Sequence, residues 1–404
     1  MSLIGRPRFG PAGVVLVCAA VACVGDFFTG PATPPIVAAP PPVFPQVDVN
    51  PAGATLGAVG ATVTLSTTFL DSAGNPVSGV RVTWRTLNSA IATVGVNGRV
   101  TAVASGQAAI AGTADTLTGY ALLTVAVAQA NPFATWQAVP SPVPDELRAV
   151  WALDASDVYA AGKAGRVLHQ TGSGWSSLAL GVKENLNAVW GGSDTSVFIV
   201  GDGGRLLRLN GTAWSASKVG STTLRAVWGA SPADVFLAGD GGRVWRLDGP
   251  SWTLLATGAT KNLAGVWGTS ASDVYVVGDG GTVLHFDGAV WTKLASGTTK
   301  NLRAVWGVSP SDVFVAGDGG TLLHFDGTGW SAMTSPVPDG INALWGTAHS
   351  EVYATTSTGK ILHFNGTAWT IAATFGGNLK GIWGAYNALA YAVGGGGKIV
   401  RGAP

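Results

Sequence analysis

The chain has few of the residues needed for thiol chemistry or for long helices. Its 404 residues include only two cysteines, Cys18 and Cys23, and both stand near the N-terminus. The absence of thiols after Cys23 excludes a disulfide framework, a thiolate metal site and a cysteine nucleophile. Charged residues make up only 11% of the chain, so the Glu- and Lys-rich runs that favour helices are scarce. We therefore expect an all-β protein.

An excess of charge of one sign is also missing. The formal net charge is +1, and no cluster of Lys and Arg follows the first residues. Binding to a phosphate backbone requires such a cluster, so nucleic acid is not an expected partner. The chain instead contains 59 glycines and 16 tryptophans. Many glycines with regularly spaced aromatic residues indicate short strands joined by tight turns.

One sequence pattern recurs seven times and organises most of the chain. In the copy that begins at Leu302, four short apolar runs are separated by turns rich in Gly and Asp. A nearly constant period with four strands in each copy predicts the blades of a β-propeller, here over residues 129–404. The copies begin at Leu147, Leu186, Leu224, Leu263, Leu302, Ile341 and Leu379.

The seventh copy is incomplete, because the chain ends at Pro404 before a second tryptophan. In the other copies this second tryptophan precedes the first tryptophan of the next copy at a nearly constant spacing, as Trp291 precedes Trp306. Trp136 precedes Trp151 at the same spacing, although it has no blade of its own. We therefore expect residues 134–139 to complete blade 7, which would close the ring and remove two edge strands.

The regularly spaced tryptophans are interpreted as core residues. Because they recur in every blade, packing between sheets explains them better than a sugar-binding platform does. Trp245 alone falls outside the pattern, and it is a candidate for a ligand-binding face. The expected structural residues at the first tryptophan of each blade are Trp151, Trp190, Trp228, Trp267, Trp306, Trp345 and Trp383.

Asp326, Gly327 and Trp330 follow the third strand of their copy, and equivalent residues recur in other copies. With these residues, the blades resemble bacterial propeller repeats of the broad BNR/Asp-box type. A strict Asp-box has one residue between its Asp and its Gly, whereas these two residues are adjacent here. The resemblance therefore implies the fold of the repeat and does not carry over sialidase activity.

The N-terminal residues have the pattern of an export signal. Arg6 and Arg8 precede an apolar run that is too short to span a membrane permanently. The small residues before Cys23 resemble a bacterial lipoprotein signal, which implies a signal peptide over residues 1–22 and lipidation of Cys23. Ordinary cleavage and secretion is the alternative, and either location is extracytoplasmic. Residues 23–46 are rich in proline and predict an extended tether.

Residues 47–128 follow a different pattern. Val80, Val82 and Trp84 alternate with polar residues, and turn residues recur at short intervals. This predicts a β-sandwich of about seven strands, with Trp84 in its core. The segment resembles the bacterial Ig-like domain of group 2, which implies an extracytoplasmic spacer or adhesion module without catalysis. The resemblance rests on residues 71–77, 82–84, 92–94, 97–102 and 106–110.

Two sets of polar residues recur in the blades. The third strand carries His or Arg at one fixed place, and five blades carry Asp or Glu twelve positions earlier, as in Asp312 and His324. We expect these side chains to pair within each blade across a hairpin turn. Histidines at equivalent positions of different blades are expected to lie too far apart to share an ion, so no metal site is predicted from them.

The second recurring set is an Asp in the turn between the second and third strands. Asp-Gly suits a tight hairpin turn, and a bound cation is the weaker interpretation of these residues. Blades 1 and 6 have Lys163 and Ser357 at this position, which makes both candidates for a ligand face. The four turn residues are Asp202, Asp240, Asp279 and Asp318.

A propeller enzyme needs catalytic groups that break the sevenfold pattern. The sequence has no elbow serine, no phosphate-binding loop that opens a helix, and no long insertion. We therefore expect a non-catalytic, monomeric binding or scaffold protein without a cofactor, which presents a propeller face to a protein or glycan ligand. A carbohydrate-active propeller enzyme, either a glycoside hydrolase or a lyase, and a structural or assembly factor are the alternatives.

Overall fold

The computed structural model describes residues 46–71, 75–103, 106–114, 117–125, 133, 135–172, 174–385 and 389–404. The predicted signal peptide, Cys23 and nearly all of the proline-rich tether lie outside the described residues. Within the described part, none of the helices has the length and apolar character needed to cross a membrane.

The described residues of the N-terminal domain form short strands in three sheets, with the orders β1-β4-β5, β2-β10-β9-β6 and β3-β8-β7. Only Leu65 separates β3 from β4, yet these strands belong to different sheets. The sequence pattern suggests one strand over this segment, whereas the structure has two. Trp84 is half-buried, and its ring packs against the core beside Gly112. The strands are β1 (Gln46–Asn50), β2 (Gly53–Leu56), β3 (Thr62–Thr64), β4 (Ser66–Leu70), β5 (Pro76–Val77), β6 (Thr83–Thr86), β7 (Ala92–Val94), β8 (Arg99–Ala102), β9 (Gly106–Ala114) and β10 (Leu117–Val125).

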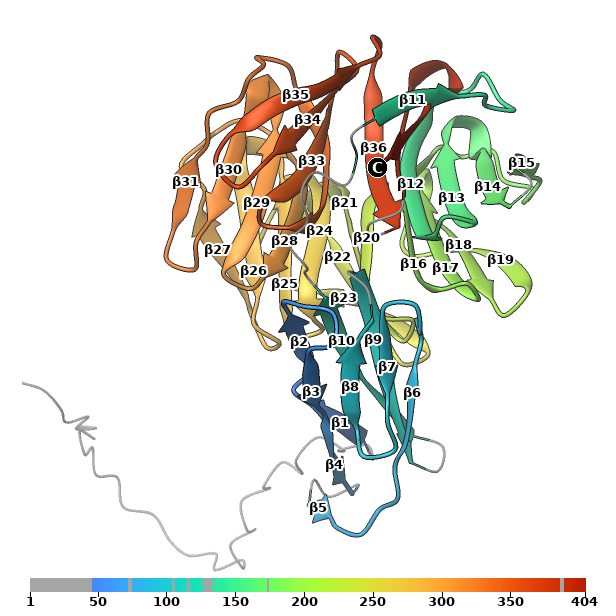
Figure 1. Ribbon diagram of the computed structural model, residues 1–404, viewed down its shortest axis with the longest axis vertical. Coiled ribbons are helices and arrows are strands. Elements are labelled where there is room, and N and C mark those ends of the chain that lie inside the picture. Colours follow the sequence, from blue (N-terminus) through green and yellow to red (C-terminus); the bar gives the residue numbers. More distant parts are fainter. Residues whose placement is uncertain are drawn as a thin grey trace, which may run out of the picture. The chain divides into compact units, whose positions relative to one another are not determined.

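In the described part of the chain, the remaining strands form seven four-stranded antiparallel sheets, which are the blades of a propeller (Figure 1). We name the strands of each blade a to d from the centre outward. Blade 1 contains β12 (Leu147–Asp154), β13 (Asp157–Gly162), β14 (Val167–Thr171) and β15 (Gly174–Leu178). Blade 2 contains β16 (Leu186–Ser193), β17 (Ser196–Gly201), β18 (Arg205–Asn210) and β19 (Ala213–Lys218). Blade 3 contains β20 (Leu224–Ser231), β21 (Asp234–Gly239), β22 (Val244–Asp248) and β23 (Ser251–Leu255).

Blades 4 to 7 repeat this arrangement. Blade 4 contains β24 (Leu263–Ser270), β25 (Asp273–Gly278), β26 (Thr282–Phe286) and β27 (Trp291–Ala295). Blade 5 contains β28 (Leu302–Ser309), β29 (Asp312–Gly317), β30 (Leu322–Phe325) and β31 (Trp330–Ala332). Blade 6 contains β32 (Ile341–Ala348), β33 (Glu351–Thr356), β34 (Lys360–Phe364) and β35 (Trp369–Thr374). Blade 7 contains β36 (Leu379–Ala385), β37 (Leu389–Gly394), β38 (Ile399–Ala403) and β11 (Thr135–Val139).

Strand β11 closes the ring. It pairs antiparallel with β38 and places Trp136 opposite Gly402. Strand β12 packs against β16 on one side and β36 on the other, so the inner strands form a continuous circle. The predicted fold, an Ig-like sandwich with a seven-bladed propeller closed by an N-terminal strand, is confirmed.

Neighbouring blades pack through the first tryptophan of strand a. The Trp267 ring of blade 4 lies over Gly307 of blade 5, where a Cβ would stand 2.6 Å from the ring. The same contact joins Trp151 to Gly191, and it explains why Gly follows Trp in most inner strands. Most of these tryptophans are nearly inaccessible to solvent, which is the expected state of a core aromatic residue.

Short 3-10 turns connect strands b and c in six blades. In blade 2 the residues with positive φ are Gly203 and Gly204, at 62° and 76°, and Asp202 is not among them. The glycines therefore supply the left-handed conformation that this hairpin needs. The turns are η1 (Lys163–Gly165), η2 (Asp202–Gly204), η3 (Asp240–Gly242), η4 (Asp279–Gly281), η5 (Asp318–Gly320) and η6 (Gly395–Gly397).

Candidate ligand-binding face of the propeller

A ring of mostly long polar side chains surrounds one mouth of the central channel. Each blade contributes the residue that follows the leading residue of its strand a, so the sevenfold repeat places these side chains at one level. The mouth is a cavity of about 430 Å³. The ring consists of Arg148, Asn187, Arg225, Ala264, Arg303, Asn342 and Lys380.

Neighbouring side chains hold this ring in place. The Nη1 of Arg148 donates to Asn187 Oδ1 at 2.6 Å, and Arg303 Nη1 donates to Asn342 Oδ1 at 3.1 Å. The Nε of Arg148 donates to Glu146 at 3.0 Å. Guanidinium groups therefore stand in defined positions at the mouth instead of sweeping freely through solvent, which favours recognition of a planar anion.

Lys380 is the cation of the ring that lacks an ion pair within the described residues. Burial of its ammonium group lowers the pKa of Lys380, and the carboxylate of Glu146 opposes this shift only in part. The guanidinium groups of Arg303 and Arg148 lower the pKa further. A bound anion would relieve this repulsion, so the mouth is electrostatically suited to a negatively charged group.

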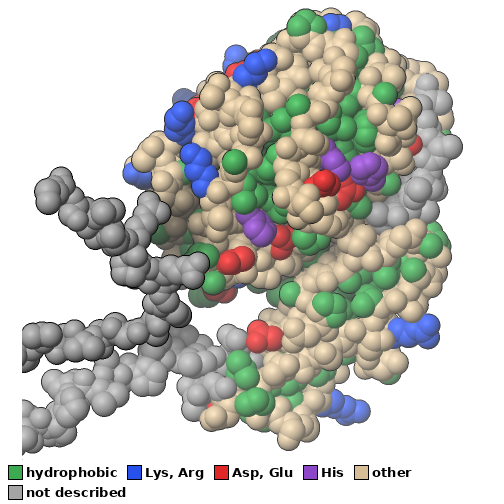
Figure 2. All heavy atoms as spheres, turned by 90° about the vertical axis from the view of Figure 1, so that its left-hand side faces the viewer, with side chains coloured by type: hydrophobic (Ala, Val, Ile, Leu, Met, Phe, Trp, Pro, Cys, Tyr) green, Lys and Arg blue, Asp and Glu red, His purple; other side chains and the backbone are tan. Residues whose placement is uncertain are grey.

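Lys and Arg collect at this end of the whole propeller. We call the end that carries the b–c and d–a connections the cationic face, and the opposite end the acidic face. In Figure 2, Lys and Arg side chains gather along the upper left edge of the propeller, whereas Asp, Glu and His gather away from it. Among the described residues, the cationic face carries fourteen Lys and Arg: Arg148, Lys163, Arg166, Lys183, Arg205, Lys218, Arg225, Arg243, Lys261, Lys300, Arg303, Lys360, Lys380 and Lys398.

The described carboxylates of the propeller are divided almost evenly between the two faces. The cationic face has eight of them: Asp145, Glu146, Glu184, Asp202, Asp240, Asp279, Asp318 and Asp339. The acidic face has ten: Asp154, Asp157, Asp194, Asp234, Asp248, Asp273, Asp287, Asp312, Asp326 and Glu351. Of the described cations, only Arg208, Arg246 and Arg401 stand beside these ten. The propeller therefore has one face with an excess of positive charge and one with an excess of negative charge, although the net charge of the chain is small.

Below the mouth, the channel wall is formed mainly by small apolar side chains. It is a cavity of about 180 Å³ lined by small aliphatic residues such as Ala149, Val227, Val266 and Val305 in addition to the polar ring. Within the described part of the chain, no aromatic side chain lines either cavity. Such a wall suits a narrow aliphatic chain better than a sugar ring, which commonly stacks on an aromatic face.

The turn aspartates predicted as weak metal candidates are already hydrogen-bonded on separate blades. Asp202 accepts from Asn185 and Asn187 at 2.8 and 2.9 Å. Asp279 accepts from Asn262 at 3.0 Å, and Asp318 accepts from Arg303 at 2.5 Å. Asp240 pairs with Arg225. These residues order the cationic face, and the structure does not bring them together as ligands of one ion.

The three residues singled out as ligand-face candidates lie in different settings. Lys163 Nζ is 3.5 Å from Glu146 Oε1, so it belongs to the edge of the mouth. The backbone N–H of Ser357 donates to Gly340 at 2.8 Å in the corresponding turn of blade 6. The ring of Trp245 is half-buried and packs over Gly220, where a Cβ would stand 2.9 Å from it.

The repeated acid–base pairs form on the acidic face. His324 Nε2 lies 2.7 Å from Asp312 Oδ1, and His285 Nε2 lies 2.6 Å from Asp273 Oδ1. Equivalent pairs occur in blades 1, 3 and 6. The blade 2 residue, Arg208, instead lies 4.9 Å from the centre of the Phe198 ring.

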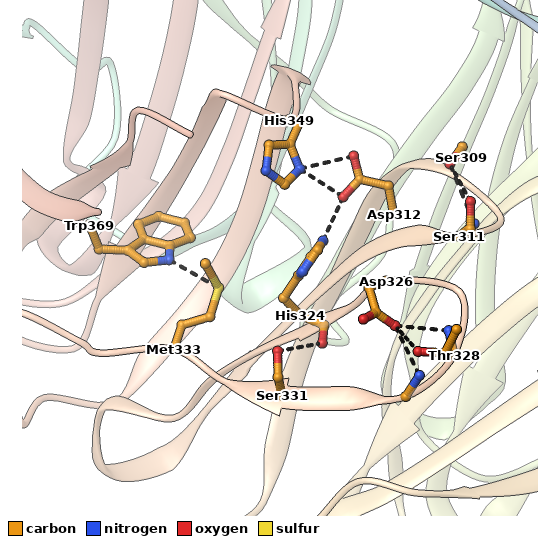
Figure 3. A network of polar contacts seen from close by, with 11 residues as sticks. Ser309, Ser311, Asp312, His324, Asp326, Thr328, Ser331, Met333, His349 and Trp369 are labelled. Carbon is orange, nitrogen blue, oxygen red and sulfur yellow. Dashed lines mark hydrogen bonds and ion pairs between the residues drawn. The ribbon is translucent and has the colours of Figure 1, made fainter. Parts of the chain in front are cut away.

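His349 adds a third group to the pair in blade 5. It comes from the loop between β32 and β33 of blade 6, and its Nδ1 lies 3.0 Å from Asp312 Oδ1 (Figure 3). Sequence reasoning missed this residue, although it breaks the repeat: the equivalent position of blade 5 is Pro310. It also missed the cationic ring, whose signal was a polar residue directly after most of the leading Leu and Ile residues.

Comparison with known proteins supports both folds. Residues 43–125 match the family model described as "Bacterial Ig-like domain (group 2)". No curated protein matches the chain. Among solved structures, YCF48 bound to D1 peptide is similar at 17% identity, with a TM-score of 0.57, and the match covers 69% of this chain and 96% of that one.

Two further structures show the same likeness. YCF48 from Cyanidioschyzon merolae is 18% identical with a TM-score of 0.55, and the match covers 67% of this chain and 98% of that one. The WD40 β-propeller domain of Doa1 is 11% identical with a TM-score of 0.58, over 67% of this chain and 96% of that one. At these identities the likeness shows the propeller fold alone. That fold is compatible with a binding or scaffold role.

Proposed function

We propose that this chain is a non-catalytic, extracytoplasmic binding protein whose cationic face receives an acidic, extended segment of another polypeptide. The observation that carries the proposal is the ring of Arg148, Arg225, Arg303 and Lys380 at the mouth of an apolar channel. Carboxylates of the ligand would meet oriented guanidinium groups, while an aliphatic part would enter the narrow channel.

A polypeptide fits the mouth better than a glycan does, since the described residues that line the two cavities include no aromatic side chain. The first tryptophan of each strand a, the natural platform for a sugar, packs between blades instead. One of the structurally similar proteins, YCF48, is a propeller bound to a peptide, which supports the idea that this architecture can accommodate such a ligand.

The carboxylates at the mouth favour binding over catalysis. Glu146 and Asp318 each accept a hydrogen bond from an arginine, at 3.0 and 2.5 Å. Burial alone would raise the pKa of Glu146, but the Arg148 hydrogen bond and the nearby cations lower it overall. A general acid at neutral pH needs a raised pKa, so Glu146 is better suited to holding Arg148 in position.

Binding is tested by fluorescence anisotropy with a fluorescein-labelled hexaglutamate peptide. We expect the double substitution R303Q/K380Q to weaken binding at least tenfold, and higher salt to weaken binding to the unaltered chain. Lys293→Gln provides the control, because Lys293 lies in the middle of outer strand β27. Equal binding by the double variant, or equal binding of a hexaserine peptide, would refute an anion-selective mouth.

The non-catalytic and surface assignments have their own tests. Turnover of a panel of chromogenic glycosides that is lost in Glu146→Gln would show that the chain is an enzyme. For location, we infer that Cys23 is lipidated and anchors the chain to a membrane. Radiolabelled palmitate should therefore label the unaltered chain and not Cys23→Ala; label retained by the variant would exclude this anchor.

A further inference from the structure

The acidic face holds one cluster of side chains that departs from the sevenfold pattern. His324 of blade 5 and His349 of blade 6 both point at the carboxylate of Asp312 (Figure 3). Their nitrogen atoms lie 2.7 and 3.0 Å from the same oxygen, Asp312 Oδ1. Two imidazole groups from different blades therefore converge on one carboxylate.

We propose that Asp312, His324 and His349 bind one divalent transition-metal ion of the Zn²⁺ type. One ligand atom from each residue lies within 4.8 Å of the other two. Two imidazole nitrogens and one carboxylate oxygen form a set that Zn²⁺ prefers. The proposed site lies on the face opposite the cationic mouth, so it does not depend on the function proposed above.

The observed distances are close to those that a bound ion requires. Ligand bonds to Zn²⁺ are about 2.0–2.2 Å, so tetrahedral ligand atoms stand about 3.3 Å apart. The two imidazole nitrogens need to move away from Asp312 Oδ1 by roughly half an ångström from their hydrogen-bonded positions. His349 can supply this movement because its side chain is 47% exposed on a loop, whereas Asp312 and His324 are 21% and 19% exposed.

The surroundings leave one side of the cluster open. The ring of Phe314 lies 4.7 Å from the His324 ring and 5.6 Å from the His349 ring. The ring of Phe364 also lies 5.6 Å from His349. These apolar rings cover the inner side and limit the rotation of both imidazoles, while the exposed edge of His349 provides an entry path and room for a water ligand.

The other blades provide an internal comparison. Blade 4 has an equivalent pair at a similar distance, with His285 Nε2 2.6 Å from Asp273 Oδ1. The residue that corresponds to His349 is there Pro310, which offers no side-chain ligand. In the part of the chain that the structure describes, no other group of three His, Cys, Asp or Glu ligands is this compact. The third ligand thus distinguishes a metal site from a repeated structural pair.

The test is calorimetric titration of ZnCl₂ into the full chain, prepared without a polyhistidine tag and with any free thiol alkylated. We expect one ion per chain. His349→Ala and His324→Ala should each weaken the affinity for Zn²⁺ at least tenfold, whereas His285→Ala should leave it unchanged. Because His349 is partly exposed, its substitution should leave the fold intact, and the circular dichroism spectrum checks this.

Thermal unfolding gives a second readout that a purely hydrogen-bonded cluster would not produce. A ligand that binds only the folded chain raises the melting temperature, so Zn²⁺ should raise it for the unaltered chain and for His285→Ala but not for His349→Ala. Zn²⁺ binding of equal affinity to His349→Ala would overturn the assignment. Failure of the unaltered chain to bind Zn²⁺ at all would overturn it as well.

Discussion

At the scale of single residues, the tryptophan of one blade decides which residue the next blade can carry. Trp267 fills the space where a Cβ on Gly307 would lie, and the same relation recurs around the ring. Blade 1 is the exception, because Ala152 stands where the other six blades have Gly. The neighbouring Trp383 is correspondingly only half-buried, and its Nε1 donates to the Ala152 carbonyl at 3.2 Å. The methyl group of Ala152 thus distinguishes the contact between blades 7 and 1 from the other contacts between blades.

This packing predicts the effect of adding a methyl group elsewhere. Gly307→Ala should lower the free energy of unfolding by about 1–3 kcal/mol, because the new Cβ overlaps the ring of Trp267. Gly329→Ala is the matched control, since no atom lies within 4 Å of its added Cβ. Urea unfolding followed by tryptophan fluorescence measures both. Equal loss in the two variants would contradict the role given to the tryptophan–glycine contact.

The pH dependence of the acid–base pairs should differ in sign between blades. Burial raises the pKa of Asp312, but hydrogen bonds from His324 and His349 outweigh it and lower the pKa overall. The ionised carboxylate therefore contributes stability above pH of about 4, and this is lost as the pH falls through the folded-state pKa. For Asp234, burial outweighs Arg246 and raises the pKa, so acid should have the opposite effect.

Melting temperatures at pH 5 and pH 3, in buffer with a chelator, check this prediction. The difference between the unaltered chain and Asp312→Asn should shrink on acidification. The difference between the unaltered chain and Asp234→Asn should instead move in favour of the unaltered chain. A common direction for both variants would show that overall charge, and not the local partners, governs the acid response.

Among the strands, β11 differs from the other outer strands because no hairpin joins it to its neighbour in the sheet. Strand β15 follows its neighbour β14 in a hairpin, whereas β11 reaches β38 from the far end of the propeller sequence. Trp136 anchors it: its ring lies over Gly402 and 5.8 Å from the ring of Tyr353. Loss of this anchor would expose the edge of β38, whose free backbone groups can pair with another chain.

We therefore expect Trp136→Ala to cost about 3 kcal/mol of stability and to promote self-association. Trp175→Ala is the comparison, because Trp175 occupies the outer strand of blade 1 and packs against Tyr391, yet its strand stays tethered by a hairpin. Size-exclusion chromatography over a range of concentrations separates the outcomes. Self-association to the same extent in both variants would remove the special role of β11.

At the scale of the whole molecule, the sequence predicts the ring better than its sites. The seven blades can be predicted from the nearly constant spacing of the copies, because each blade is formed by one continuous segment of the sequence or nearly so. Their closure can be predicted from Trp136, which matches the outer strand of a repeat but has no blade of its own. The cationic ring arises only when seven such units place Arg148 and its equivalents around one axis. His349 meets Asp312 across a blade boundary, and a repeat pattern does not encode the distance between neighbouring units.

The two proposed sites should act independently, because the propeller separates them. Asp312 begins strand b at one end of its blade, whereas Arg303 and Asp318 lie at the other end. An intervening strand of about six residues spans about 20 Å, which exceeds the screening length of about 8 Å at physiological salt. A Zn²⁺ ion on the acidic face should therefore change the affinity for an acidic peptide less than twofold.

Anisotropy titrations of the hexaglutamate peptide, with and without saturating ZnCl₂, measure this coupling. A change above fivefold in the unaltered chain that disappears in His349→Ala would mean that the ion alters the arrangement of blades 5 and 6, and that the propeller transmits this change between its faces. The same change in both proteins would instead indicate direct capture of the ion by the glutamates of the peptide. Independence is the expected result, because the tryptophan–glycine contacts fix most blades against their neighbours around the ring.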